Sequence, residues 1–121
     1  MLKKDFYIIL DADSSGPKQF ILQLNEKHSI YEGHFPGQPV VPGACFLQIL
    51  KELIEVIIEK KIQLLKADEL KFLIPVNPLT NNRLQANVNY SIDDRQQINV
   101  IANFKQNENI CFKCRATFIN Q

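Results

Sequence analysis

The chain has 121 residues, enough for one ordinary domain, and 45% of them are hydrophobic, which is enough to fill one buried core. Its 14 lysines and arginines nearly balance 13 aspartates and glutamates, so no net charge is available to attract nucleic acid or anionic lipid. No apolar run reaches the roughly 18 to 20 residues of a membrane span, and the first apolar run is too short for a signal peptide. We therefore expect one cytoplasmic domain over residues 1–121.

The first third of the sequence predicts two strands followed by a long loop. Residues 6–10 and 18–25 are the strands, and the Asp-, Ser- and Gly-rich segment 11–16 is the turn between them. Residues 26–43 show no periodicity and are expected to form a structured loop. Three of the four glycines and three of the six prolines lie between Gly33 and Gly43, so the backbone there is under unusual constraint.

A helix is predicted from residue 44 to about residue 62, because apolar side chains recur around most of its circumference. Its polar positions form one narrow stripe, made of Gln48, Glu52, Glu55 and Glu59. A helix with so little polar surface is expected to be buried inside the protein. We expect Glu52 itself to be a solvated or interface residue.

After the helix the period of the apolar residues changes to two, which predicts four strands within residues 69–74, 83–90, 98–104 and 110–118. They form an antiparallel meander with one apolar face. The expected fold is α+β: a curved antiparallel sheet of about six strands wrapped around one long buried helix. Open strand edges in such a sheet favour pairing with a second copy. The inward rows are Leu70, Phe72 and Ile74; Leu84, Ala86, Val88 and Tyr90; Ile98, Val100, Ala102 and Phe104; and Ile110, Phe112, Cys114, Ala116 and Phe118.

The loop before the helix carries the candidate chemistry. Prolines at 36, 39 and 42 give a stiff, extended segment between His34 and Gly43. Gly43 stands where the helix begins, and a helix N-terminus offers unpaired N–H groups and partial positive charge. The loop therefore joins a titratable imidazole to an oxyanion-type donor. His28 is expected to be a surface or turn histidine with no catalytic role.

Metal-ligating patterns are weak in this sequence. Cys111 and Cys114 have the spacing of half a metal site, but no second pair exists and we expect free thiols. His28, Glu32 and His34 on one extended loop form a poor ligand set. We expect no metal and no cofactor.

The loop resembles the signature of the (3R)-hydroxyacyl-acyl-carrier-protein dehydratases, which are hot-dog-fold enzymes of fatty acid synthesis. A weaker likeness extends downstream, through residues 71–76 and 83–88 to nearly the whole chain. The resemblance implies a single hot-dog domain that forms a homodimer, or a trimer of such dimers. Its substrate would be an acyl thioester of acyl carrier protein or of coenzyme A. The motif reads Gly33-His34-Phe35-Pro36-x-x-Pro39-x-x-Pro42-Gly43.

The same resemblance implies roles for individual residues. His34 would remove a proton from C2 of a 3-hydroxyacyl thioester, and the Gly43 N–H would polarise the thioester carbonyl. The family's acid, which protonates the departing hydroxyl across the dimer interface, corresponds to Gln48, and an amide has no such proton to give. The residues expected to line the acyl site are Phe35, Pro42, Ala44 and Phe46.

Three hypotheses follow from this pattern. The first is a dehydratase that converts 3-hydroxyacyl to trans-2-enoyl thioesters in fatty acid or related specialised lipid synthesis. The second is a hot-dog thioesterase, for which Glu32 and Glu52 are the nearby acids. The third is a catalytically impaired, acyl-binding subunit that pairs with a complete homologue.

Overall fold

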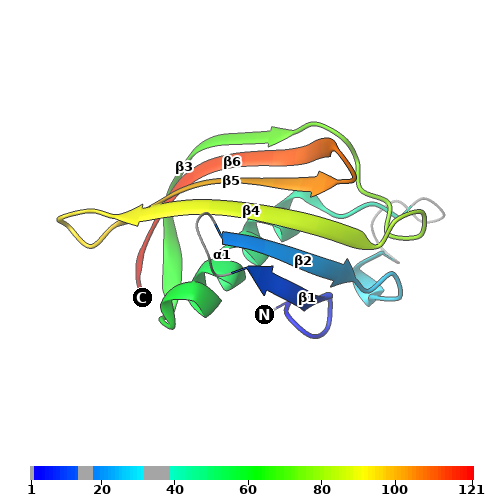
Figure 1. Ribbon diagram of the computed structural model, residues 1–121, viewed down its shortest axis with the longest axis horizontal. Coiled ribbons are helices and arrows are strands. Elements are labelled where there is room, and N and C mark those ends of the chain that lie inside the picture. The colour runs from blue at the N-terminus through cyan, green and yellow to red at the C-terminus, as the bar shows by residue number, and fades with distance from the viewer. Residues whose placement is uncertain (1, 14–17, 32–38) are drawn as a thin grey trace.

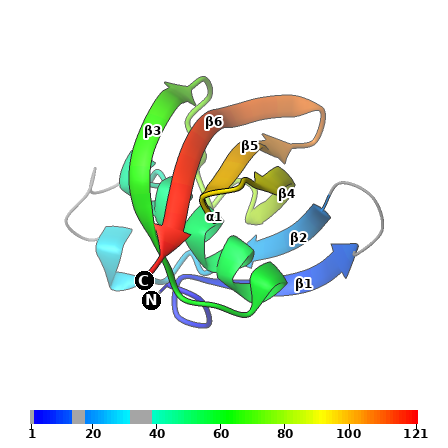
Figure 2. The ribbon, with the colours of Figure 1, turned by 90° about the vertical axis from the view of Figure 1, so that its left-hand side faces the viewer.

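The computed structural model describes residues 2–13, 18–31 and 39–121, which form six strands, one α-helix and one 3-10 turn. Figure 1 shows the sheet lying across α1, and the end-on view in Figure 2 shows the sheet curving around the helix. This is the architecture predicted from the sequence. The elements are β1 (Tyr7–Asp13), β2 (Lys18–Leu24), the turn Ser29–Tyr31, α1 (Gly43–Ile58), β3 (Ile62–Phe72), β4 (Arg83–Ile92), β5 (Ile98–Gln106) and β6 (Asn109–Asn120).

All strands pair antiparallel, in the order β1-β2-β4-β5-β6-β3. Only β4, β5 and β6 form the predicted meander, because β2 lies beside β4 and β3 crosses to the far side of β6. β1 also continues to Asp13, through residues expected to form a turn. The sheet consequently has two edges, β1 and β3, separated by the full width of the sheet.

The core lies between the concave face of the sheet and α1. Ile49, Leu50, Leu53 and Ile54 of the helix have no exposed surface. Burying one such side chain contributes about 1.5–3 kcal/mol, so this face holds the helix in the sheet. The inward rows predicted for β4, β5 and β6 are confirmed, except that Tyr90 and Ile110 are only partly buried.

The helix ends at Ile58, earlier than the predicted residue 62. Glu59 adopts a left-handed conformation, with φ 57° and ψ 40°, and its N–H donates to the carbonyl of Glu55. The Glu55 carboxylate then accepts the N–H of Ile62 at 3.0 Å, at the point where β3 begins. Ile62 continues the apolar spacing of residues 57 and 58 on the helix, but it already lies in β3.

β3 is the element that differs most from its prediction. It begins at Ile62, seven residues before the predicted start at residue 69. Leu70 and Phe72 do share the face of the inward residues, since they pair with Cys114 and Phe112 of β6, but they are less covered than expected: Leu70 is 40% and Phe72 57% exposed. Among the described strands β3 pairs only with β6, so its outer edge is open and nothing beyond it covers these side chains. Further large exposed apolar residues on and beyond this strand are Leu64, Leu65, Leu73, Ile74 and Leu79.

The left-handed cap at Glu59 predicts a stabilising substitution. A side chain with a Cβ is strained in this conformation, whereas glycine adopts it freely. Glu59→Gly should therefore raise the free energy of unfolding by about 0.5–1 kcal/mol, measured by urea denaturation. Lys60→Gly serves as the control, because it adds the same flexibility one residue away and should destabilise. An unchanged or lower stability for Glu59→Gly would contradict the assigned cap.

Candidate functional site at the start of the helix

The helix begins abruptly out of an extended segment. Pro42 precedes it with φ −60° and ψ 143° and makes no side-chain cap, while its carbonyl accepts the Cys45 N–H at 2.9 Å. The Val41 N–H donates to the carbonyl of Val76 at 2.9 Å, which fixes the approach to the helix. Within the described ranges, no backbone carbonyl accepts the N–H of Gly43 or of Ala44. These two groups therefore form a donor pair at the positive end of the helix dipole.

The ring of Phe72, at the end of β3, lies directly against Gly43. A Cβ added to Gly43 would lie 2.8 Å from Cε1 and 2.9 Å from Cζ of this ring. Real side chains do not approach so closely, so the contact requires glycine at position 43. The requirement is steric, and it comes from a strand that follows the helix in the sequence.

Phe46 belongs to an aromatic cluster behind the helix start. Its ring stacks on Phe112 with centroids 5.1 Å apart and meets the edge of Phe104 at 5.4 Å. The Phe72 ring also packs on Phe112, with centroids 5.1 Å apart and the two planes tilted by 34°. Phe46 is only 4% exposed, so the structure makes it a core residue. Its contact with an acyl chain stays a prediction, as do those of Pro42 and Ala44.

Gln48 lies on α1, five residues after Gly43, and its side chain is hydrogen-bonded to Glu52. Its Nε2 donates to Glu52 Oε2 at 2.7 Å. The same oxygen accepts the Leu2 N–H at 2.8 Å, and Oε1 accepts the Lys3 N–H at 2.8 Å and the Tyr7 hydroxyl at 3.1 Å. Glu52 thus ties the N-terminal residues and β1 to the helix.

The expectation that Glu52 is solvated or lies in an interface is wrong, because its side chain is buried, with 2% exposure. Burial alone raises its pKa, but hydrogen bonds from Leu2, Gln48, Lys3 and Tyr7 more than offset this and hold the pKa below its usual value. Burial and the neighbouring Glu52 raise the pKa of Tyr7. The pair is therefore an ionised carboxylate and a neutral phenol. Helical spacing could not reveal this, because three of the four donors come from residues 2–7.

Several predicted residues lie outside the described residues, namely Glu32, His34 and Phe35. The roles assigned to them stay predictions. His28 is a turn residue, as expected: its Nδ1 accepts the Ile30 N–H at 3.0 Å, and its ring meets the edge of Phe6 at 5.3 Å.

The three cysteines, Cys45, Cys111 and Cys114, are buried free thiols. Burial, with a contribution from Glu69, raises the pKa of Cys114 to about 11, which makes it unreactive at neutral pH. Across the parts of the chain that the structure describes, no three His, Cys, Asp or Glu side chains gather as a metal site. Nor does any described helix have the length and apolarity to cross a membrane.

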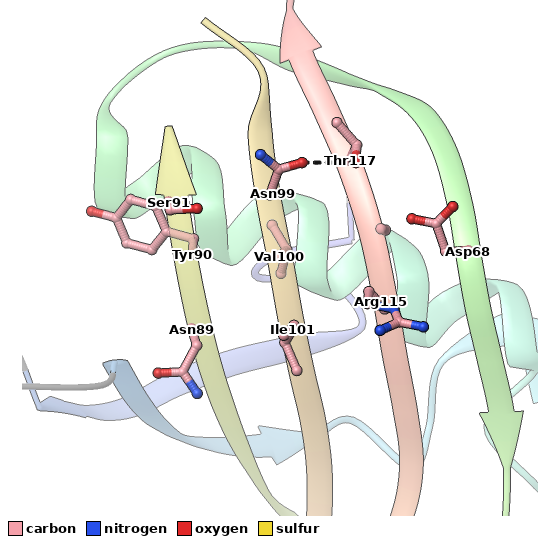
Figure 3. Close-up of a pocket in the computed structure, with 10 residues that line it drawn as sticks. Asp68, Asn89, Tyr90, Ser91, Asn99, Val100, Ile101, Arg115 and Thr117 are labelled. Carbon is pink, nitrogen blue, oxygen red and sulfur yellow. Dashed lines mark hydrogen bonds between the residues drawn. The ribbon is translucent and has the colours of Figure 1, made fainter. Parts of the chain in front are cut away.

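A hollow lies on the outer face of the sheet, away from the candidate site. It encloses about 360 Å³ over β4, β5 and β6, and Figure 3 shows its lining residues in front of the sheet with α1 behind it. Within it the Thr117 hydroxyl donates to Asn99 Oδ1 at 3.1 Å, and Arg115 lies nearby. None of the residues predicted for the site lines this hollow.

Comparison with known proteins places the chain in a family. The sequence profile of the ApeI-like family, described as ApeI dehydratase, matches residues 11–114. The chain belongs to the ApeI-like dehydratase family. No curated protein sequence shows significant similarity to it.

Solved structures confirm the hot-dog fold expected for a member of this family. The ApeI:P dehydratase heterocomplex of Xenorhabdus doucetiae superimposes with a TM-score of 0.72 and 17% identity, covering 93% of this chain and 97% of that one. A sigma28-regulated virulence protein of Campylobacter jejuni gives 0.70 and 13%, covering 97% and 85%. A phenylacetic acid degradation-related protein of Ralstonia eutropha, provisionally named a thioesterase, gives 0.61 and 15%, covering 93% and 83%. At these identities the likeness concerns the fold.

The contact between Gly43 and Phe72 predicts a coupled pair of substitutions. In the wild-type chain, Gly43→Ala should cost about 1 kcal/mol, because the new methyl group displaces the Phe72 ring from Phe112. In a Phe72→Ala background the same change should be neutral or stabilise by a few tenths of a kcal/mol, since alanine favours a helix more than glycine does. Urea denaturation of the four proteins gives the coupling. Additive effects would contradict the packing described here.

Proposed function

We propose that the chain acts on acyl thioesters in the cytoplasm, interconverting 3-hydroxyacyl and trans-2-enoyl forms at the start of α1. The observation that carries the proposal is the N–H pair of Gly43 and Ala44, which no backbone carbonyl of the described residues accepts, in a chain of the ApeI-like dehydratase family. Donors at a helix N-terminus stabilise the negative charge that develops on a thioester carbonyl as a proton leaves C2. The substrate is carried by acyl carrier protein or by coenzyme A.

His34 is the base in this proposal. It takes the C2 proton while the Gly43 N–H polarises the carbonyl, and Phe35 and Phe46 lie on the acyl side. The departing 3-hydroxyl then needs a proton. Gln48 supplies none, and its Nε2 is already bonded to Glu52.

Glu52 does not replace the missing acid. It is 2% exposed, ionised and occupied by four donors, so it has neither a proton to give nor an open face for attack on a thioester. This also removes Glu52 as the nucleophile or base of a thioesterase. The homodimer is therefore expected to be a slow dehydratase, limited at position 48.

A hydration assay tests this proposal. Purified protein is mixed with trans-2-enoyl-coenzyme A, and loss of the enoyl absorbance is followed. His34→Ala should lower the rate at least 100-fold, which is typical for loss of a general base, whereas the control His28→Ala should leave it unchanged. Gln48→Glu should raise the rate at least tenfold. The adjacent charge of Glu52 would raise the pKa of the introduced carboxyl. In the reverse assay, which follows the gain of enoyl absorbance from 3-hydroxyacyl-coenzyme A, the dehydration rate of Gln48→Glu should therefore fall as pH rises through that pKa, because the carboxyl must be protonated to give its proton to the hydroxyl.

Absence of turnover in every variant, on both coenzyme A and carrier-protein substrates, would contradict the proposal. Release of free thiol from acyl-coenzyme A by the wild-type protein, detected with a thiol reagent, would show a thioesterase instead.

The open edge of β3 favours a second candidate function, in which the chain supplies one of the two different subunits of a dehydratase. β3 has an open edge with large apolar side chains, and one structural relative is a dehydratase heterocomplex. In a mixed dimer, a partner with an acid at the position of Gln48 would complete the site that contains His34. The alternative is the homodimer, or a trimer of such dimers, in which both sites carry glutamine.

Reconstitution separates the two assemblies. A mixture with an acid-bearing hot-dog homologue should hydrate enoyl thioesters at least tenfold faster than either protein alone. Leu70→Lys on β3 should abolish both the gain and the complex seen by size-exclusion chromatography. Ile101→Lys is the matched control, because this residue is 60% exposed on the outer face of β5 and should have no effect. A mixture no faster than the sum of its parts would exclude the mixed site.

A further inference from the structure

We infer that a hollow on the outer face of the sheet, where β4 begins and β5 ends, binds the phosphate group of a small phosphate monoester. Figure 1 shows these two strand ends side by side. The inference goes beyond the proposed function, because α1 and the candidate site lie on the opposite face of the sheet. We call this the cationic hollow, and its lining includes Arg83, Lys105, Ile21, Asn81, Gln85 and Asn107.

The pairing of β4 with β5 brings two cationic side chains together. Leu84 and Phe104 are buried, so the residues next to them in each strand face outward. These neighbours are Arg83 on β4 and Lys105 on β5. Lys105 pairs directly with Gln85, which makes Arg83, two residues earlier, its diagonal neighbour. Diagonal neighbours on one face of a sheet lie about 7–8 Å apart, within reach of long side chains.

The positive charge of the hollow is not balanced by a carboxylate. Neither Arg83 nor Lys105 forms an ion pair with a described residue, whereas two lysines of β3 each lie beside a carboxylate. No described Asp or Glu lines the hollow. Asp11 on β1 is separated from β4 by β2, and Glu108 follows in the turn after β5. Two like charges in one hollow repel each other, and an anion between them removes that repulsion.

Hydrogen bonds hold the frame of the hollow in place. Gln106 Nε2 donates to the carbonyl of Asn81 at 2.8 Å and to that of Arg83 at 2.9 Å. Asn81 Oδ1 accepts the N–H of Arg83 at 3.0 Å. The loop before β4 is thereby tied to the end of β5, so the backbone that carries Arg83 is fixed. The NH₂ group of Asn81 makes no hydrogen bond to a described residue and is left as a further donor.

The chemistry of the lining favours a phosphate monoester over other anions. The planar guanidinium of Arg83 can donate two parallel hydrogen bonds to phosphate oxygens, and Lys105 adds a point charge. Two cations match the charge of about −1.5 to −2 on a phosphate monoester at neutral pH better than the single charge of a carboxylate.

The size of the hollow indicates that the phosphate carries an organic group. The hollow encloses about 260 Å³, whereas one water molecule occupies about 30 Å³ in the liquid. This leaves room for a phosphate and a small organic group, and Ile21 offers that group an apolar contact.

Isothermal titration at low ionic strength tests the inference with ribose 5-phosphate, inorganic phosphate and ribose as probes. The wild-type protein should bind ribose 5-phosphate more tightly than inorganic phosphate, and ribose should not bind. The double variant Arg83→Gln/Lys105→Gln should bind ribose 5-phosphate about tenfold more weakly or worse, because it loses the charge-assisted bonds.

Lys66→Gln/Lys71→Gln is the matched control. It removes the same charge from the outer face of the sheet, but from lysines that already lie near Asp68 and Glu69 and outside the hollow. It should keep the wild-type affinity.

A second measurement places the bound phosphate in the wild-type protein. In the ¹⁵N-correlated NMR spectrum, ribose 5-phosphate should shift the backbone signals of Gln85, Gln106 and Asn107. The start of α1 is the competing anion site, because a helix N-terminus also binds phosphate. The signals of Gly43 and Ala44 should therefore stay unchanged.

The results that would overturn the inference are distinct from a failure of the proposed function. They are no binding of either phosphate probe, an equal loss of affinity in the two double variants, tighter binding of inorganic phosphate than of ribose 5-phosphate, or shifts confined to Gly43 and Ala44. None of them bears on turnover of enoyl thioesters, which the hydration assay measures separately.

Discussion

Burial of α1 inside the curved sheet is the constraint on which the rest of the structure depends. Four large aliphatic side chains of the helix are fully covered, so the helix has little freedom in position or rotation. The place where the chain enters this enclosed space, at Pro42 and Gly43, thereby becomes a fixed helix N-terminus, whose first N–H groups have no backbone acceptor among the described residues. The polar stripe of a buried helix must find partners inside the protein, and Glu52 does so through residues 2, 3 and 7.

Features set by local sequence could be predicted. The alternation of apolar and polar residues predicted the inward rows of β4, β5 and β6, because each of these strands has one face on the core and one in solvent. Apolar residues around most of the helix indicated that it is enclosed. The proline and glycine spacing located the helix start to within one residue, since proline fixes φ and glycine permits close approach.

Features set by distant contacts could not be predicted. The helix end at Ile58 depends on a left-handed Glu59 and on the carboxylate of Glu55 reaching Ile62. The need for glycine at position 43 comes from Phe72, 29 positions further along the sequence. The burial of Glu52 comes from the N-terminal segment. For Gly43 and Glu52 the deciding group lies on another element, and no periodicity records it.

In the proposed function the Gly43 N–H polarises the thioester carbonyl, whereas Gln48, whose Nε2 donates to Glu52, has no proton to give to the departing hydroxyl. A crystal structure of the protein with an unreactive amide analogue of (R)-3-hydroxyoctanoyl-coenzyme A tests the placement of this site most directly. The expected result is the amide carbonyl on the Gly43 N–H, with Gln48 Nε2 still on Glu52. A carbonyl bonded elsewhere, or an acyl chain in the outer hollow of Figure 3, would contradict the proposed site.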